Sequence, residues 1–112
     1  MQSLRRASVE LEGLLKALAD PTRRAVFERL IAREESVATL TAASRVSQSA
    51  VSQHIAVLAK AGLLKGRQIG RSTLYRANPR ALEPLIDWVE RQNRFWQAAL
   101  RRLDETLKEI KE

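Results

Sequence analysis

The sequence of 112 residues contains no cysteine, which excludes disulfide bonds and thiolate metal ligands. Its single histidine, His54, supplies too few donors for an ordinary transition-metal site. We therefore predict that the protein binds no metal ion and no other cofactor. No run of about 18 apolar residues occurs, so no transmembrane helix is expected. The segment Met1–Arg6 lacks the apolar stretch of a secretory signal, and the predicted location is the cytoplasm.

The sequence also lacks the usual signatures of an enzyme. It has only four glycines and no glycine-rich loop that would cradle a phosphate, and no nucleophile stands in an evident pair with a base. Glu34 and Glu35 form a carboxylate pair, but they follow the expected end of a helix and are interpreted as solvated side chains. The protein is predicted not to be an enzyme.

Acidic residues are absent from the middle of the chain. None occurs between Glu35 and Glu83, although the whole sequence has a net charge of +7. The segment between them carries all of the excess positive charge, because the flanking segments are close to neutral. Its basic residues are Arg45, Lys60, Lys65, Arg67, Arg71, Arg76 and Arg80. A solvated charged face would explain them, but a surface without any acidic residue favours contact with a nucleic acid.

Hydrophobic periodicity predicts four helices before the first strand. Leucines at helical spacing indicate a helix over about residues 4–19, and Asp20 and Pro21 suit the start of a second helix that runs to about Arg33. Its apolar positions Val26, Phe27, Leu30 and Ile31 fit the helical period of 3.6 residues. A short helix over residues 36–46 and a helix over residues 48–61, capped by Ser47 and ended by Gly62, follow closely. Two helices joined so tightly are typical of a helix-turn-helix.

The period then changes from that of a helix to that of strands. Residues 64–69 and 72–77 flank Gly70 and Arg71, which predicts a β-hairpin. A long helix over about residues 80–110 completes a mainly α, winged helix-turn-helix fold in a single domain. The divisions are an N-terminal dimerisation helix (1–19), the helix-turn-helix (36–61), the wing (63–77) and a C-terminal dimerisation helix (80–110). The last helix is too long for so small a domain to bury alone, which predicts a homodimer.

The helix over residues 48–61 has two contrasting faces. Val51, Ile55 and Leu58 cluster on the predicted core side. The opposite side and its flank are small and polar, with Gln48, Ser49, Ser52, Gln53, Ala56 and Lys60. Glutamine and serine can hydrogen-bond to base edges, and alanine can contact a thymine methyl group. An unremarkable polar face is the alternative, but within a helix-turn-helix we predict that Gln48, Ser49, Ser52 and Gln53 read bases.

The predicted hairpin and two helix-end positions offer contacts to the DNA backbone. Lys65, Arg67 and Arg71 are expected to bind phosphates, whereas a solvated role for Arg76 is equally plausible. The full set predicted to contact the DNA backbone is Thr22, Arg23, His54, Lys60, Lys65, Arg67, Arg71 and Ser72. The residues predicted to form the dimer interface are Leu4, Leu11, Leu14, Leu15, Trp88, Trp96, Leu100, Leu103 and Leu107. Asn93 falls near this stripe and is a candidate for setting helix register.

The order of these motifs resembles the ArsR/SmtB family of bacterial winged-helix repressors. The resemblance covers roughly residues 14–89 and rests on three stretches: Ala17-Leu18-Ala19-Asp20-Pro21-Thr22-Arg23-Arg24, Ser47–Leu58, and Ala61-Gly62-Leu63-Leu64 with the later Gly70-Arg71 and Tyr75. It implies a homodimer held by the first and last helices, with the helix at 48–61 in the major groove. It also implies that Thr22 and Arg23, at a helix start, contact phosphate.

The sequence departs from this family at its metal sites. Cysteines of the family stand where this chain has Ser36–Thr39, and the last helix has carboxylates but no histidine. A structural or phosphate-contacting role is favoured for His54 over a ligand role. Trp88, Phe95 and Trp96 are interpreted as dimer core, with a small-molecule pocket as the alternative. A small-molecule effector is possible but unidentified.

The leading hypothesis is a sequence-specific dimeric transcriptional regulator, more specifically a repressor, that binds double-stranded DNA at an inverted repeat. The main alternative is a non-specific or architectural DNA-binding protein, which would share the positive charge but would not need the Ser/Gln face. A protein-interaction module that uses the long last helix is a third hypothesis, and the intact wing argues against it.

Overall fold

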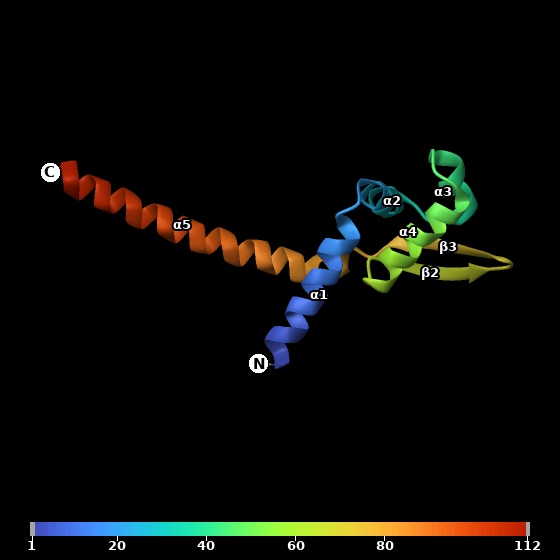
Figure 1. Ribbon diagram of the computed structural model, residues 1–112, viewed down its shortest axis with the longest axis horizontal. Coiled ribbons are helices and arrows are strands. Elements are labelled where there is room, and N and C mark those ends of the chain that lie inside the picture. The colour runs from blue at the N-terminus through green and yellow to red at the C-terminus, as the bar shows by residue number, and fades with distance from the viewer. Residues whose placement is uncertain (1, 112) are drawn as a thin grey trace.

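The computed structural model describes residues 2–111, with side chains from residue 8 to residue 111. Figure 1 shows a small body of helices and strands from which one long helix projects. The helices are α1 (Gln2–Leu18), α2 (Pro21–Ala32), α3 (Val37–Ala43), α4 (Gln48–Lys60) and α5 (Glu83–Lys111), with a 3₁₀ helix η1 (Pro79–Leu82) before α5. The strands are β1 (Glu35–Ser36), β2 (Leu64–Ile69) and β3 (Ser72–Ala77). The predicted fold class, a mainly helical winged helix-turn-helix, is confirmed.

The helix boundaries follow local capping signals. The Asp20 carboxylate accepts hydrogen bonds from the backbone N–H groups of Thr22 and Arg23, at 2.8 and 3.0 Å, and Pro21 occupies the first turn of α2. Ser47 caps α4 in the same way through the N–H of Ala50. These side chains satisfy backbone donors that have no partner inside the helix, and each contributes about 1 kcal/mol to helix stability.

The core lies where α1, α2, α3 and α4 meet the base of the hairpin. Its most completely buried large side chains are Leu30, Val51, Leu58 and Leu63. The predicted core face of α4 is confirmed, because Val51, Ile55 and Leu58 are all buried. Of the apolar residues at helical spacing in α2, Val26, Phe27 and Leu30 are buried, whereas Ile31 is 54% exposed. That residue stands at the edge of a core face centred on Val26, Phe27 and Leu30, so the helix turns it toward solvent.

The sheet has three strands in the order β1-β3-β2. The hairpin has the predicted limits, with Leu64 opposite Ala77 and Ile69 opposite Ser72. Strand β1 was not predicted, and it pairs Glu35 with Tyr75 and Ser36 with Leu74. The helix expected over residues 36–46 is shorter at both ends, because Ser36 belongs to β1 and caps α3, and the extended backbone of Ser44 ends the helix at Ala43. A strand of two residues has no periodicity of its own that a sequence could reveal.

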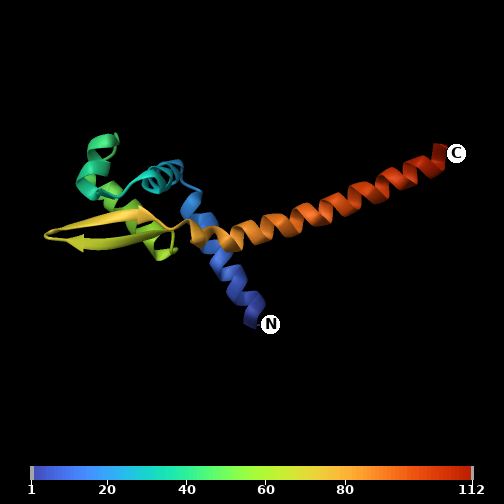
Figure 2. The ribbon, with the colours of Figure 1, turned by 180° about the vertical axis from the view of Figure 1, so that it is seen from behind.

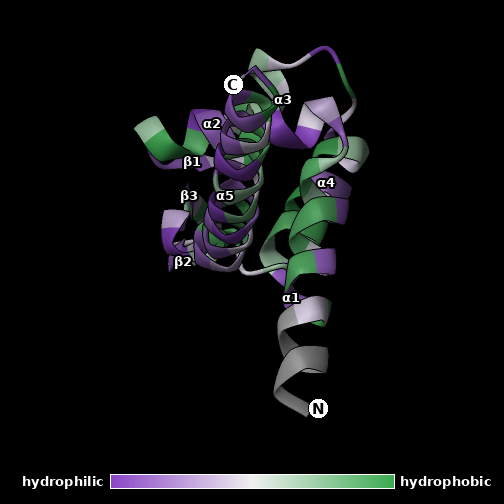
Figure 3. Ribbon diagram, turned by 90° about the vertical axis from the view of Figure 1, so that its left-hand side faces the viewer, coloured by the Kyte–Doolittle hydropathy of each residue, from purple (hydrophilic) through white to green (hydrophobic). Residues whose placement is uncertain are grey.

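Helix α5 extends from the body on the side away from the hairpin tip (Figures 1 and 2). Its start differs from the expected helix over 80–110, because the 3₁₀ turn η1 precedes it and Pro84 lies in its first turn. Viewed from the end where α5 faces the reader, the helix displays both hydrophobic and hydrophilic residues (Figure 3). None of its side chains is buried, although apolar residues recur along its whole length. The apolar side chains along α5 are therefore exposed to solvent in the single chain.

Candidate nucleic-acid interface

Helix α4 presents its polar face outward at the edge of the body. Its buried side chains hold it against α2 and α3, and its N-terminal cap fixes where it begins. The residues on the outer face are brought together around one shallow, open hollow that is lined by Gln48, Ser49, Ser52, Gln53 and Ala56. All five are exposed and none is charged. The structure therefore places the four predicted base-reading residues on one continuous surface that a DNA base edge can approach.

The hairpin beside α4 forms the wing. Its two-residue turn has Gly70 at a φ of +60° followed by Arg71, as in a type II′ turn, so Arg71 stands at the tip. Gly66 on β2 has a different role, because a Cβ atom there would lie 3.0 Å from Cε1 of Tyr75 and 3.1 Å from Cγ2 of Thr73. The wing side chains Lys65, Arg71, Ser72 and Arg76 are exposed. They form a basic surface available to phosphates.

One wing arginine is held by a carboxylate from another part of the chain. Arg67 donates two hydrogen bonds to Glu34, from Nε to Oε2 at 2.6 Å and from Nη2 to Oε1 at 2.9 Å. The Arg67 guanidinium lowers the pKa of the Glu34 carboxyl below its ordinary value, chiefly through these hydrogen bonds. The prediction that Glu34 is a solvated side chain is therefore wrong, because Glu34 is half-buried and paired with Arg67. Arg67 can reach a phosphate only if it leaves this partner.

Comparison with known proteins identifies the family. A helix-turn-helix domain family matches residues 18–67. The HTH-type transcriptional regulator Rv2034 of Mycobacterium tuberculosis is 41% identical over 85 residues, which cover 76% of this chain and 77% of that protein. The solved structure of an ArsR-like transcriptional regulator from Rhodococcus sp. RHA1 is 28% identical, with a TM-score of 0.78 over 88% of this chain and 92% of that one. The chain belongs to the ArsR family.

Membership of the ArsR family makes this protein a DNA-binding transcriptional regulator, as its exposed α4 face and basic wing suggest. Relatives differ in the direction of regulation. The transcriptional activator HlyU of Vibrio cholerae is 31% identical over 91 residues, which cover 81% of this chain and 84% of that protein. Other similar proteins are named as repressors.

A second glutamate of this ArsR-family chain anchors β1. Glu35 is only 5% exposed, and its carboxylate accepts hydrogen bonds from Nε and Nη2 of Arg29 at 2.5 and 2.9 Å. Arg33 adds an ion pair at 3.3 Å. Hydrogen bonding to Arg29 holds the pKa of Glu35 below its ordinary value, although burial acts in the opposite direction. The prediction of a solvated carboxylate is wrong here, because the turn after α2 directs Glu35 back onto that helix.

Two kinds of group at the start of α2, the Arg23 guanidinium and the first backbone N–H groups, are engaged within the chain. The Arg23 guanidinium donates to the backbone oxygens of Ala17 and Lys16, at 2.6 and 3.0 Å, and therefore closes the end of α1. The backbone N–H groups of Thr22 and Arg23 already bind the Asp20 carboxylate. This helix start is thus occupied by an anion from its own chain. His54 is half-buried, with Nδ1 at 3.5 Å from Nη1 of Arg23.

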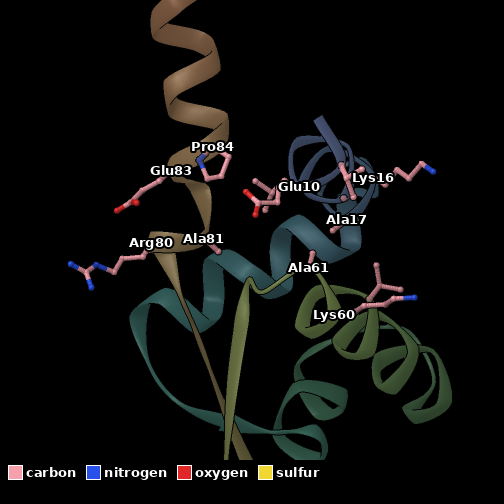
Figure 4. A pocket seen from close by; sticks show the side chains of 13 residues that line it. Glu10, Lys16, Ala17, Lys60, Ala61, Arg80, Ala81, Glu83 and Pro84 are labelled. Atoms are coloured by element: carbon pink, nitrogen blue, oxygen red, sulfur yellow. The ribbon is translucent and has the colours of Figure 1, made fainter. Parts of the chain in front are cut away.

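An apolar groove lies on the side of the body away from the wing tip. It has a volume of about 830 Å³ between α1, the end of α4 and the start of α5. Figure 4 shows Lys60 and Ala61 on one wall, with Ala81 and Pro84 on another. Lys60 therefore lies on the groove as well as on α4, at the end of the helix farthest from Gln48.

The predicted dimer residues fall into two groups. Leu14 is 3% exposed and belongs to the core of its own chain, whereas Leu15 is 49% exposed. The α5 residues of the predicted set are all exposed, namely Trp88, Trp96, Leu100, Leu103 and Leu107. Leu11 is half-buried, and the side chain of Leu4 lies outside the described residues.

Neither a metal centre nor a membrane span is found in the described part of the chain. Within residues 2–111 no three histidine or carboxylate side chains gather closely enough to hold a metal ion. No helix in that range combines the length and the apolarity needed to cross a bilayer.

Proposed function

We propose that this ArsR-family protein is a homodimeric, sequence-specific repressor that reads an inverted-repeat operator. The observation that carries the proposal is the uncharged Gln/Ser face of α4, which is continuous, exposed and flanked by a basic wing. Surface helices of soluble proteins usually carry charged pairs at this spacing. A face of short polar side chains instead allows close approach to base edges and discrimination among them.

The proposed contacts divide between bases and backbone. Gln48, Ser49, Ser52 and Gln53 would face base edges in the major groove. The backbone contacts would come from the exposed wing residues Lys65, Arg71, Ser72 and Arg76, with Thr22, His54 and Lys60 as secondary candidates. Arg23 is left out of this set because its guanidinium is engaged with α1. Arg67 would contact the DNA backbone only when its side chain is released from Glu34.

Two copies are needed for the operator geometry. A dimer would present its two α4 helices to half-sites about one helical turn, roughly 34 Å, apart. The exposed apolar stripe of α5 supports a homodimer, because large side chains such as Leu100 and Leu103 are each 55% exposed in the single chain. Burying such a stripe against a second copy removes it from water. The terminal helices are the proposed dimerisation elements of this single-domain protein.

The first expected result concerns salt. Operator DNA would be obtained by selecting bound sequences from a random pool. Affinity for that DNA should fall about 1000-fold between 50 mM and 200 mM salt, because each protomer neutralises several phosphates. A gel-shift titration over salt measures this fall, with a scrambled duplex as the control. A flat salt response, or equal affinity for the scrambled duplex, would reject sequence-specific binding and favour an architectural protein.

A second expected result concerns Glu34. The change Glu34→Gln should weaken the hold on Arg67 and make that arginine available to phosphate. DNA affinity should rise several-fold at 100 mM salt. The slope of log affinity against log salt should become steeper by about 0.9 for each additional phosphate contact.

Glu12→Gln is the matched control for this change. Glu12 also pairs with a basic residue, Lys16, but both side chains are exposed and lie on α1 rather than at the wing. The Glu12→Gln variant loses one negative charge, as Glu34→Gln does, and so corrects for the change in net charge. If both variants show the same salt slope, Arg67 stays away from the phosphates and the proposed release is wrong.

A further inference from the structure

One half-buried arginine joins the end of α1, the start of α2 and the middle of α4. Arg23 lies in the first turn of α2, and its Nε and Nη2 donate to the backbone oxygens of Ala17 and Lys16. Its third nitrogen, Nη1, lies 3.5 Å from Nδ1 of His54. His54 is the only histidine of the chain, and it follows Gln53 of the proposed base-reading face. The arginine therefore connects the end of a neighbouring helix to the DNA-reading helix.

This contact determines which ring nitrogen of neutral His54 carries the hydrogen. A guanidinium has only donors, so the nitrogen that faces it has to be the acceptor. Nδ1 therefore presents its lone pair to Arg23, and the hydrogen is on Nε2. The opposite tautomer would set two donors against each other across 3.5 Å. Among the described side chains, residues 8–111, none forms a hydrogen bond with Nε2, so this N–H can donate to an acceptor outside the chain.

We propose that Arg23 is a positioning residue, which holds the His54 ring so that its Nε2–H donates to a phosphate of bound DNA. The proposal rests on the DNA-binding function proposed above and adds the donor atom and the residue that orients it. His54 is half-buried on the flank of α4, next to its core side, and not on the outer Gln/Ser face. A residue on the flank of a helix in the major groove lies nearer to the DNA backbone than to the base edges.

Hydrogen-bond chemistry makes one tautomer suitable for both neighbours of the ring. Arg23 can only donate, and a phosphate oxygen of the DNA backbone can only accept. With the hydrogen on Nε2, Nδ1 of His54 accepts from the arginine while Nε2 donates to the phosphate. With the hydrogen on Nδ1, both contacts would be lost, because a donor would face a donor and a lone pair would face the phosphate oxygen. Arg23 therefore acts on DNA through His54, although its own guanidinium is engaged with α1.

The single histidine makes the tautomer directly measurable by NMR. Long-range proton–nitrogen correlation at about pH 8.5, where histidine is ordinarily neutral, resolves the two ring nitrogens. We expect Nδ1 to have the shift of an unprotonated ring nitrogen and Nε2 that of a protonated one. When DNA is added, the Nε2–H proton should become visible, because a hydrogen bond to phosphate protects it from exchange with water. A protonated Nδ1, or an Nε2–H that stays unprotected on DNA, would overturn the proposal.

Arg24 supplies a matched control for Arg23. Its Nη1 also donates to backbone oxygens at the end of α1, those of Leu18 at 2.7 Å and Ala19 at 3.2 Å, but within residues 8–111 it has no hydrogen bond with His54. Arg23→Met and Arg24→Met each remove one positive charge and hydrogen bonds to the end of α1. Only Arg23→Met removes the partner of Nδ1, so only this variant should mix the two tautomers. The same nitrogen shifts in both variants would show that Arg23 does not set the ring.

A double-mutant cycle tests whether Arg23 acts on DNA through His54. Arg23→Met should weaken binding about 10-fold in the natural chain and less than about 2-fold in the His54→Ala background, where the contact is already lost. Arg24→Met should have the same effect in both backgrounds. Additive losses for Arg23 and His54 would contradict the positioning role. The coupling should also appear on a scrambled duplex, because phosphate contacts carry no sequence information. Equal affinity for operator and scrambled DNA would therefore reject the sequence-specific function while this coupling stands.

Substitutions of His54 test the donor atom even if Arg23→Met does not fold. A glutamine side chain can place its amide nitrogen near the position of Nε2, whereas the shorter asparagine places its nitrogen near that of Nδ1. We expect His54→Gln to bind DNA within about 3-fold of the natural chain and His54→Asn to bind about 10-fold more weakly. Circular dichroism checks that both variants keep their helix content. Equal losses in the two variants would show that Nε2–H is not the donor.

Discussion

Replacing Ser49 and Gln53 together by alanine is expected to lower the affinity for operator DNA by at least about 100-fold, since each good base contact contributes about 1–3 kcal/mol. Both side chains are exposed on the outer face of α4 and neither is part of the core. Alanine is the best helix former, so the helix should remain folded. Affinity for a scrambled duplex should change by less than about 2-fold, because phosphate contacts supply most non-specific binding.

Lys65→Ala supplies the contrast to this double variant. Lys65 is an exposed wing residue, and its loss should weaken binding to operator and scrambled DNA by a similar factor. Gel shifts on both duplexes, with circular dichroism to confirm helix content, measure the two effects. If the double variant weakens both duplexes equally, α4 does not read sequence. The architectural alternative would then be preferred.

Replacing Glu35 by alanine is expected to lower the free energy of unfolding by about 2 kcal/mol at neutral pH. Hydrogen bonds to charged groups contribute about 1.5–3 kcal/mol, and Arg29 keeps some access to water after the loss of its partner. The change would also remove the ion pair with Arg33 at the entrance to β1. Urea unfolding at one fixed protein concentration measures the effect, because dimer stability depends on concentration. A change below about 0.5 kcal/mol would show that this pair contributes little to the fold.

The pH dependence of this effect follows from the lowered pKa of Glu35. A carboxyl with a lower pKa in the folded state stabilises the fold above its unfolded pKa of about 4.3 and loses that contribution as pH falls through the folded pKa. Glu35→Gln cannot ionise, so the difference in stability between it and the natural chain should be larger at pH 6 than at pH 3. A difference that is constant over this range would contradict the role assigned to the ionised carboxylate.

Local signals in the sequence predicted most of the elements. Asp20 and Ser47 were identified as helix caps, and the hairpin limits followed from a change of period around Gly70 and Arg71. These features depend on hydrogen bonds and side-chain spacing within a few residues, so a short stretch of sequence is enough to predict them. The α4 polar face was predicted for the same reason, since its position opposite Val51, Ile55 and Leu58 is a property of helical periodicity alone.

Interactions between distant segments were not predictable in this way. Arg67 and Glu34 are 33 residues apart, and nothing in either neighbourhood indicates that β1 will run beside β3. Arg23 resembled a phosphate contact because it follows a helix start, yet the turn between α1 and α2 brings it to the end of α1. Leu14 and Leu15 are both apolar and adjacent, and packing alone places one in the core and leaves the other exposed.

The sequence by itself determined the helices, the wing, the absence of thiol chemistry and the uncharged face that we propose reads DNA. The tertiary structure decided which charged side chains remain available to a ligand. It engaged Arg23 and Arg67 within the chain and left Lys65, Arg71 and Arg76 exposed. The physical reason is the separation along the chain over which each kind of interaction acts. Backbone hydrogen bonding and periodicity act over a few residues, whereas an ion pair forms only after packing has brought two remote segments within about 4 Å.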